Sequence, residues 1–477
     1  MILPEDRPES PSKQDPPVSA PATDAEHPPP AYPGHGASGS RVQAGPNETQ
    51  PIVYVPVQVR RGEPAGQRFC KAFFVALLIY FLLAAVTSSI AGLGRSRHGW
   101  NRELIEDLDT ARPTAKDGVA LRCIKGPDAW PAGQEPMMTT FKLDRMSDVL
   151  YVFTRGKYLS GNVVITQDER IEDLDSVHVD VTPLHNTPDW LSAVSVCSLM
   201  RGPNERGIGI FSPTQWRSSK IPGLEFEVTI RLPRLPDEVL QVARLETNVP
   251  NFTQHIGDLN ETVLFRDLEL KSSNSHISSQ SLNALVAQVI TSNSHIVGQF
   301  QASESLGLRT TNGAINVTAT LVHSNPEDMQ GPVLKMKTSN AKIDSFVNLV
   351  STLPPMYHGQ GGDFTVEANT SNVRLSLDFP TAPVDSKLNL LARTSNAKAH
   401  VRLHPTYEGR FSLRTSNQVA FVDNRPITDP SGKNRSRSIA LYNNKWAYAH
   451  GLAVWDGEYM GNVDVKTSNA PAELYLA

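Results

Sequence analysis

One short phrase recurs eight times in the last 210 or so residues of this 477-residue chain: two hydroxyl-bearing residues followed by an asparagine. The eight asparagines are Asn274, Asn293, Asn312, Asn340, Asn372, Asn396, Asn417 and Asn469. Successive copies lie 19 to 32 residues apart, except for one gap of 52 residues. Repeats of this length are typical of solenoids, in which each repeat forms one coil that packs against its neighbours. The phrase therefore predicts stacked coils.

Apolar residues occupy fixed positions around each asparagine. The residues six and four positions before it are apolar in every copy, and the residue three positions after it is Ile, Leu or Ala. Spacing by two is the period of a β-strand, because successive side chains point to opposite faces. We therefore predict two short strands per coil, with the asparagine at the corner between them, where stacked amides can form a hydrogen-bonded ladder. An antiparallel sandwich with Thr-rich turns is the alternative.

The rest of the chain divides by composition. Residues 1–66 contain 14 of the 36 prolines and no sustained apolar period, which is typical of a disordered tail. Residues 72–93 carry no charge over 22 positions, so residues 67–95 are expected to hold one transmembrane helix with its flanks, in preference to a signal peptide. Residues 100–265 contain non-repeating β-type segments. They are expected to form a membrane-proximal β-rich domain that caps an all-β solenoid of residues 266–477.

Basic residues on both sides of the apolar run hardly decide its orientation. Glycosylation sequons and cysteines favour a cytoplasmic N-terminus and an extracellular or luminal C-terminal domain. The five sequons are at Asn251, Asn260, Asn316, Asn369 and Asn434. Cys123 and Cys197 are candidates for a disulfide in an oxidising compartment. Cys70, at the membrane edge, is a candidate for palmitoylation or an unmodified thiol.

One segment carries a family resemblance. The stretch Val228–Pro233, followed by repeated strands such as Leu306–Val317, resembles the "putative adhesin" family of β-solenoid domains of unknown function. The Pro-rich tail and single transmembrane helix look like fungal members of that group. The likeness covers roughly residues 225–477 and implies a β-solenoid without established catalytic residues. The turn of that family often has Gly after the Asn, whereas here only Gly313 fits.

Motifs for enzymatic chemistry are missing from the sequence. It contains no nucleophile elbow, zinc-protease motif, Cys-x-x-Cys pair or phosphate-binding glycine loop. Glycoside hydrolysis typically needs paired carboxylates, but the acidic residues of the coils lie at different offsets. These residues are Asp344, Asp464, Glu367 and Glu473. We therefore predict no enzyme, no catalytic residue and no cofactor, with a membrane-tethered polysaccharide-processing β-helix enzyme as the alternative.

Metal and nucleic-acid binding are not expected either. His276 and His295 occupy the same position in adjacent coils and are expected to stack, but two ligands are too few for a metal site. The net charge of −4 does not favour nucleic acid as a partner.

Basic residues recur three positions before the asparagine, in six of the eight copies. They are Lys271, Arg309, Lys337, Arg393, Arg414 and Lys466. In-register stacking would bring these like charges within about 5 Å of each other along one sheet, and an anionic polymer would relieve their repulsion. Alternatively, the long stems shield the strands and counterions screen the charges. Our hypothesis is an adhesin-like binding or structural protein at a cell surface, whose basic face docks acidic polysaccharide or another anionic surface component.

Insertions and the tail give two further candidates. Residues 323–332, 351–363 and 423–457 interrupt the repeat at the same point of the coil, so they are expected to emerge at one corner. The longest insertion contains aromatic candidates for contact with sugar rings or partner proteins, or for covering the coil edge. They are Tyr442, Trp446, Tyr448 and Trp455. In the tail, Pro29, Pro30 and Tyr32 resemble a WW-domain ligand, which predicts a WW-domain partner in the cytoplasm.

Overall fold

The computed structural model describes residues 111–130, 137–184, 188–214, 223–327, 330–354, 361–455 and 461–476. The predicted tail, transmembrane helix, palmitoylation site at Cys70 and WW ligand lie outside the described residues. Among the residues that are described, no helix is long and apolar enough to cross a membrane. Nearly all regular structure in this part of the chain is β-strand, and its helices are α3 (Pro188–Ala193) and the short 3-10 helix η1 (Pro127–Ala129).

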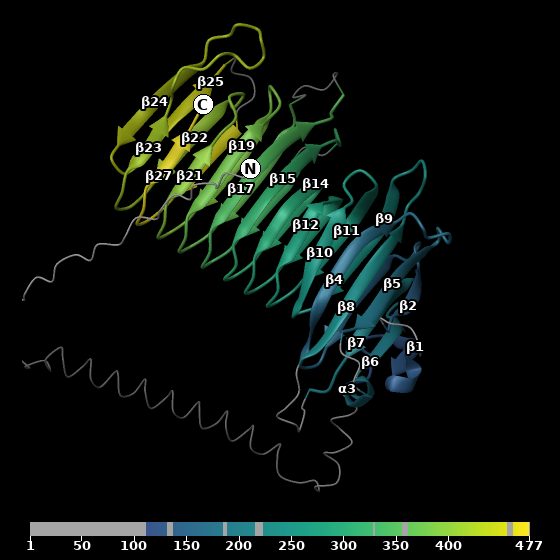
Figure 1. Ribbon diagram of the computed structural model, residues 1–477. Coiled ribbons are helices and arrows are strands. Elements are labelled where there is room, and N and C mark those ends of the chain that lie inside the picture. The colour runs from purple at the N-terminus through teal and green to yellow at the C-terminus, as the bar shows by residue number, and fades with distance from the viewer. Residues whose placement is uncertain are drawn as a thin grey trace, which may run out of the picture. The chain divides into compact units, whose positions relative to one another are not determined.

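The strands form one continuous sheet that winds into two parallel ladders (Figure 1). The first ladder holds the strands before each corner, in the spatial order β7 (Glu205–Phe211), β3 (Val149–Arg155), β9 (Leu240–Asn248), β11 (Val263–Lys271), β13 (Asn283–Ile290), the second half of β14 (Ile296–Arg309), β16 (Val333–Lys337), β18 (Asp363–Asn369), β20 (Lys387–Arg393), β26 (Gly461–Lys466) and β22 (Gly409–Arg414).

The second ladder holds the strands after each corner. Its spatial order is β8 (Leu224–Pro233), β4 (Leu159–Asp168), β10 (Phe252–Asp258), β12 (Ile277–Ser281), the first half of β14, β15 (Ile315–His323), β17 (Ile343–Ser351), β19 (Leu375–Thr381), β21 (Ala399–Arg402), β27 (Ala472–Tyr475) and β23 (Ala420–Asp423). Parallel neighbours contradict the antiparallel-sandwich alternative. The all-β prediction is confirmed, and the mostly parallel sheet is consistent with the predicted β-solenoid.

Apolar side chains fill the space between the two ladders. The residues six and four positions before each corner asparagine, and three positions after it, are buried in every copy. In one coil these residues are Leu306, Leu308 and Ile315, each at most 1% exposed. Burying a side chain of this size stabilises the fold by roughly 1.5–3 kcal/mol, so the fixed offsets are the main reason why the coils stack.

Two rows of polar contacts hold the corner. The hydroxyl residue two positions before the asparagine is buried in each copy, and its hydroxyl donates to a backbone carbonyl, as Thr338 Oγ1 does to Gly313 at 3.0 Å. The asparagine amides donate from coil to coil at 2.7–3.1 Å. The ladder runs through Asn251, Asn274, Asn293, Asn312, Asn340, Asn372, Asn396, Asn469 and Asn417. The predicted ladder therefore exists, and it begins one coil before the first repeat.

Spatial order departs from chain order at both ends of the stack. The coil β7–β8 lies outside β3–β4, although it follows β3–β4 in the sequence. At the other end, β26–β27 lies between β20–β21 and β22–β23, although it follows both. Parallel strands present evenly spaced backbone donors and acceptors, so a coil can pair with any neighbour of matching register.

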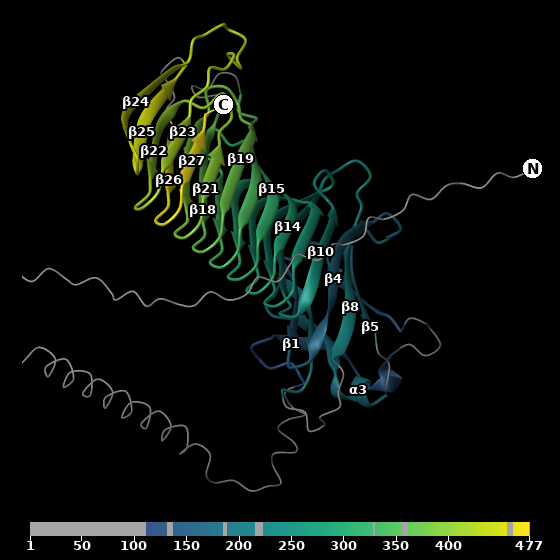
Figure 2. The ribbon, with the colours of Figure 1, turned by 60° about the vertical axis from the view of Figure 1, so that its left-hand side comes forward.

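Antiparallel strands close the two ends. At one end β6 (Ser195–Met200) and β1 (Val119–Lys125) extend the first ladder, while β5 (Ser176–Pro183) and β2 (Thr139–Asp144) extend the second. Cys123 and Cys197 lie opposite each other on β1 and β6 and are joined as a disulfide. At the other end the hairpin β24 (Ser438–Lys445) and β25 (Tyr448–Val454) covers β22 (Figure 2).

The expected domain boundary near residue 265 does not interrupt the ladders. The segment expected to form a separate cap contributes three coils of its own, β7–β8, β3–β4 and β9–β10, and only its outermost strands run antiparallel. These coils lack the repeated phrase, apart from Asn251 in the asparagine ladder, so the sequence period stops before the stacking does.

Candidate functional site

The six predicted basic residues lie in one row on the outer surface of the first ladder. In-register pairing places the residues in the order Lys271, Ile290, Arg309, Lys337, Asn369, Arg393, Lys466 and Arg414. We call this the basic row. Its neighbours stand about 4.8 Å apart, the spacing of adjacent strands.

Local partners neutralise the two ends of the basic row. Lys271 forms an ion pair with Glu269, and Lys466 Nζ lies 3.2 Å from a carboxylate oxygen of Asp464. The Arg414 guanidinium lies 5.5 Å from the centre of the ring of Tyr448. Such contacts satisfy the charges without a ligand.

The middle of the row has no such compensation. Arg309, Lys337 and Arg393 are exposed, as is Lys335 two positions upstream, and none of the four makes an ion pair with another described residue. Glu367 lies opposite Lys335 in the register and accepts a hydrogen bond from the Asn369 amide at 2.7 Å, so its carboxylate lies near the cations without forming an ion pair with them. The centre of this face is therefore a patch of unpaired positive charge.

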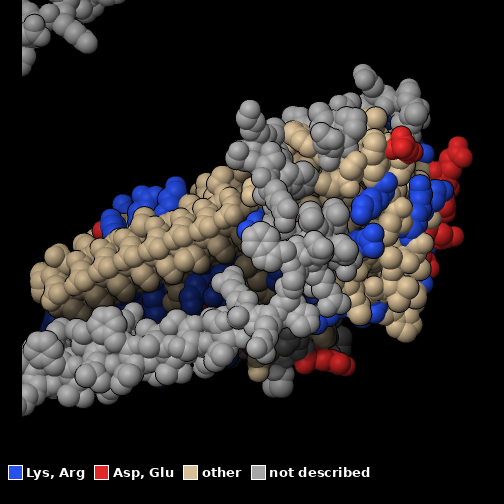
Figure 3. Space-filling view, turned by 90° about the horizontal axis from the view of Figure 1, so that it is seen from below, with Lys and Arg blue, Asp and Glu red and all other residues tan. Residues whose placement is uncertain are grey.

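The corner itself is an uncharged ridge between two basic flanks. Figure 3 shows it as a continuous band without Lys, Arg, Asp or Glu, with Lys and Arg on both sides. The second flank lies directly before the strands of the second ladder, two positions after the asparagines, at Lys342, Arg374 and Lys398. The alignment of the repeats already contained this second basic offset, but only the structure shows that the ridge separates the two rows.

Carboxylates neutralise the second flank. Asp344 lies 3.4 Å from Lys342 Nζ and 3.0 Å from the Arg374 guanidinium, and Glu473 lies 2.5 Å from Lys398 Nζ. Burial pushes the pKa of Glu473 upwards, but hydrogen bonds from Lys398 and His400 outweigh it and hold that pKa below its usual range. Both flanks therefore consist of Lys and Arg, but the second flank is paired with carboxylates, whereas the middle of the basic row is not.

Aromatic residues stand at both ends of the face that carries the basic row. Beyond Lys271 the register continues to Asn248 and Phe153, beside a hollow of about 270 Å³. Beyond Arg414 it continues to Tyr448, beside a hollow of about 530 Å³ that Tyr442 and His450 also line.

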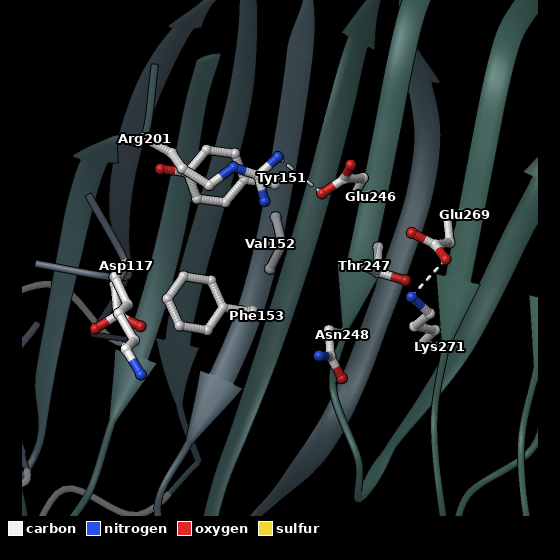
Figure 4. Close-up of a pocket in the computed structure, with 11 residues that line it drawn as sticks. Asp117, Tyr151, Val152, Phe153, Arg201, Glu246, Thr247, Asn248, Glu269 and Lys271 are labelled. Carbon is white, nitrogen blue, oxygen red and sulfur yellow. Dashed lines mark hydrogen bonds and ion pairs between the residues drawn. The ribbon is translucent and has the colours of Figure 1, made fainter. Parts of the chain in front are cut away.

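The hollow near Phe153 is built from segments far apart in the sequence (Figure 4). The guanidinium of Arg201 lies over the ring of Tyr151, 4.7 Å from its centre, and reaches Glu246 at 3.0 Å. The bare backbone of Gly207 makes room for Tyr151, since a Cβ there would lie 2.3 Å from the ring. Burial raises the pKa of Tyr151 to about 12. No repeat period links these residues, so sequence reasoning missed the hollow.

The four aromatic candidates of the longest insertion are not equivalent. Tyr442 and Trp446 are 64% and 61% exposed, and Tyr448 is half-buried. Trp455 fits the alternative role of covering the coil edge and not that of an exposed contact, because its side chain is buried and its Nε1 donates to a backbone carbonyl at 2.9 Å. The guanidinium groups of Arg435 and Arg437 lie 5.5 and 5.7 Å from its rings. It therefore helps to hold the insertion against the end of the stack.

The asparagines of the predicted glycosylation sequons differ in solvent exposure. Asn316 and Asn434 are exposed, whereas Asn260 is half-buried. The amide of Asn251 donates to a backbone carbonyl of β4, and that of Asn369 donates to a carboxylate.

The two histidines that were expected to stack, His276 and His295, do so. Their rings lie 4.8 Å apart and are nearly parallel. Among the described residues, no group of three or more His, Cys, Asp or Glu side chains is placed to hold a metal ion.

Comparison with known proteins adds little. No protein-family model and no curated protein matches the chain. One solved structure, described as a "putative cell adhesion protein" from Clostridium sporogenes ATCC 15579, aligns with 72% of this chain and 99% of its own length. The sequence identity is 9% and the TM-score 0.16. A TM-score this low carries no argument about fold or function.

Proposed function

We propose that this protein is a non-catalytic, adhesin-like binding protein of a cell surface, whose basic row docks an anionic polysaccharide. The observation that carries the proposal is the unpaired positive charge at Arg309, Lys337 and Arg393, repeated in register along one face. A polymer with regularly spaced carboxylates would place one charge after another against this row. Each contact would relieve repulsion between neighbouring cations as well as add attraction.

The geometry suits a linear polymer that runs across the strands. From Phe153 to Tyr448 the face spans ten steps between neighbouring strands, or about 48 Å at ~4.8 Å a step. Backbone pairing fixes the backbone positions of the residues along this line, so only their side chains have to be ordered on binding. Pre-ordered sites lose less conformational entropy and bind more tightly for the same contacts.

The anchoring of the protein is part of the same proposal. The uncharged run at residues 72–93 would cross the membrane once, with the Pro-rich tail in the cytoplasm and the solenoid outside or in a lumen. A WW-domain protein would bind Pro29, Pro30 and Tyr32 from the cytoplasmic side. Protease treatment of intact cells tests this orientation. Loss of the solenoid with protection of the tail supports it, and the reverse pattern contradicts it.

Polygalacturonate, a linear polyuronate, is a suitable probe for the basic row. In the full-length chain the double variant Arg309→Glu/Lys337→Glu is expected to bind it at least ~10-fold more weakly, a loss of about 1.4 kcal/mol. The matched control Arg374→Glu/Lys398→Glu reverses two cations on the second flank, where carboxylates already pair with the native residues. It should change the affinity far less. Unchanged binding in the first variant, or equal losses in both, would contradict docking on the basic row.

A further inference from the structure

The hollow beside Phe153 differs from the basic row in its charge. Three cations line it, Lys116, Arg201 and Lys271, and three carboxylates, Asp117, Glu246 and Glu269. Most of them already pair with one another or with a neighbour, as Arg201 does with Glu246 and Lys271 with Glu269. A hollow whose charges are balanced has no preference for an anion. It offers charged hydrogen-bonding groups to a neutral ligand.

An aromatic ring forms the floor of this hollow. Phe153 is half-buried and packs edge to face against Phe211 with ring centres 5.5 Å apart, which fixes its orientation. In Figure 4 the Phe153 ring lies between Asp117 on one side and Asn248 on the other. Arg201 covers the neighbouring Tyr151, so Phe153 supplies the exposed flat surface.

The rim supplies donors and acceptors in turn. Asn248 is exposed, and its amide both donates and accepts. The carboxylates of Glu246 and Glu269 keep lone pairs beyond their ion pairs, and Lys271 keeps N–H groups beyond its own. A sugar ring needs this combination, because its hydroxyls form a rim of donors and acceptors around an apolar face of C–H groups.

We propose that this hollow binds one neutral glycosyl unit, stacked on Phe153 and hydrogen-bonded by Asn248 and Lys271. The volume of about 270 Å³ is close to the lower end of the range of about 300–1,000 Å³ that is typical of ligand pockets, which suits one pyranose ring with its hydroxyls. The site shares Lys271 with the end of the basic row but differs in what it selects: the hollow selects a flat, uncharged ring, whereas the unpaired cations Arg309, Lys337 and Arg393 select a chain of negative charges.

Saturation-transfer NMR on the full-length chain tests the site with methyl β-glucoside and methyl α-mannoside, and with methyl β-glucuronide as the anionic counterpart. At least one neutral glycoside is expected to receive saturation on its ring C–H protons, with an affinity on the order of 1 mM. Phe153→Leu, which keeps an apolar side chain but removes the flat ring, should weaken binding at least fivefold. Asn248→Ala, at an exposed position that should not affect folding, should weaken it severalfold.

Two controls keep the site distinct from the basic row. Asn369→Ala changes the same residue type in the middle of the row and should leave glycoside binding unchanged. Arg309→Glu/Lys337→Glu should weaken polygalacturonate binding at least ~10-fold and preserve glycoside binding. The proposal is overturned if no neutral glycoside binds at ~10 mM, if the glucuronide binds more tightly than both neutral glycosides, or if neither Phe153→Leu nor Asn248→Ala weakens binding.

Discussion

The middle of the solenoid and its two ends are made of the same two-strand coils, but they are ordered in different ways. From β11–β12 to β20–β21 each coil follows its neighbour in both sequence and space. At each end a coil that comes earlier or later in the sequence sits out of turn, and antiparallel strands close the edge. The repeated phrase therefore determines the register in which two coils pair, but it does not determine which coils become neighbours.

The middle and the ends of the solenoid therefore differ in the surfaces that they present. The middle presents a uniform surface, with the basic row, the uncharged ridge and the paired second flank at constant offsets. The ends stop the stacking, because an open strand edge invites pairing with other chains. They also carry the aromatic hollows beside Phe153 and Tyr448.

Removing residues 461–477 is expected to have the largest effect on this arrangement. The deletion takes β26 from between β20 and β22 and β27 from between β21 and β23, and it exposes their backbone edges and apolar faces. Loss of Val463, Val465 and Leu474 alone removes about 1.5–3 kcal/mol of burial for each side chain. We expect aggregation on size-exclusion chromatography. A soluble truncated chain with the melting temperature of the full chain would show that β26–β27 is dispensable.

The disulfide at the opposite end offers a milder test. Cys123→Ala/Cys197→Ala should cost about 2–4 kcal/mol, the usual range for a disulfide that closes a long loop. Because the bond joins only β1 and β6, the loss should be local. Hydrogen exchange is expected to accelerate in β1, β6 and β7 and to stay slow in β15 and β17. Uniform acceleration would indicate that ends and middle unfold as one unit.

The asparagine ladder distinguishes middle from end on a smaller scale. Asn312 donates to Asn293 at 2.8 Å and accepts from Asn340 at 2.7 Å, whereas Asn417 makes a single ladder bond, to Asn469 at 3.1 Å. Asn312→Ala should lower the free energy of unfolding by about 1 kcal/mol, and Asn417→Ala by roughly half as much. Urea denaturation measures both. An equal cost would mean that the corner amides act through their own coil and not through the ladder.

A pH effect should be the smallest. Burial lowers the pKa of His276, and the neighbouring His295 and His255 lower it further. The folded chain therefore binds this proton less readily than the unfolded chain, whose histidines titrate near 6.5. Its contribution to stability is intact above about pH 6.5 and is lost as the pH falls through the folded pKa. His276→Gln should reduce the drop in melting temperature between about pH 7 and pH 5. An unchanged drop would assign it to other groups.

Much of the middle could be predicted from the sequence, because burial and turn geometry act at short range. Fixed apolar offsets gave the strand faces, and the asparagine gave the corner. The order of coils at the ends could not be predicted in this way. The coil at Asn469 has the same phrase as the others, so nothing in it indicates a place between the coils of Asn396 and Asn417.

The candidate sites also differ in how far the sequence predicts them. The basic row follows from one offset in an aligned repeat, so its residues could be listed before the structure was known. The hollow at Phe153 needs β3, β9 and β11 side by side with Arg201 and Lys116, a set that no local pattern connects. The burial of Trp455 likewise depends on how the long insertion folds back onto the stack.

The out-of-turn coil at the far end also has a consequence for the timing of synthesis. A ribosome releases β22–β23 before β26–β27, so neither β20–β21 nor β22–β23 can have its final neighbour until the later coil has emerged. During that interval the edges that β26–β27 finally covers are open to chaperones and to other nascent chains. Insertion of the later coil converts them into ordinary ladder neighbours, so a translation stop just before Gly461 would leave the chain with edges that quality-control factors can recognise.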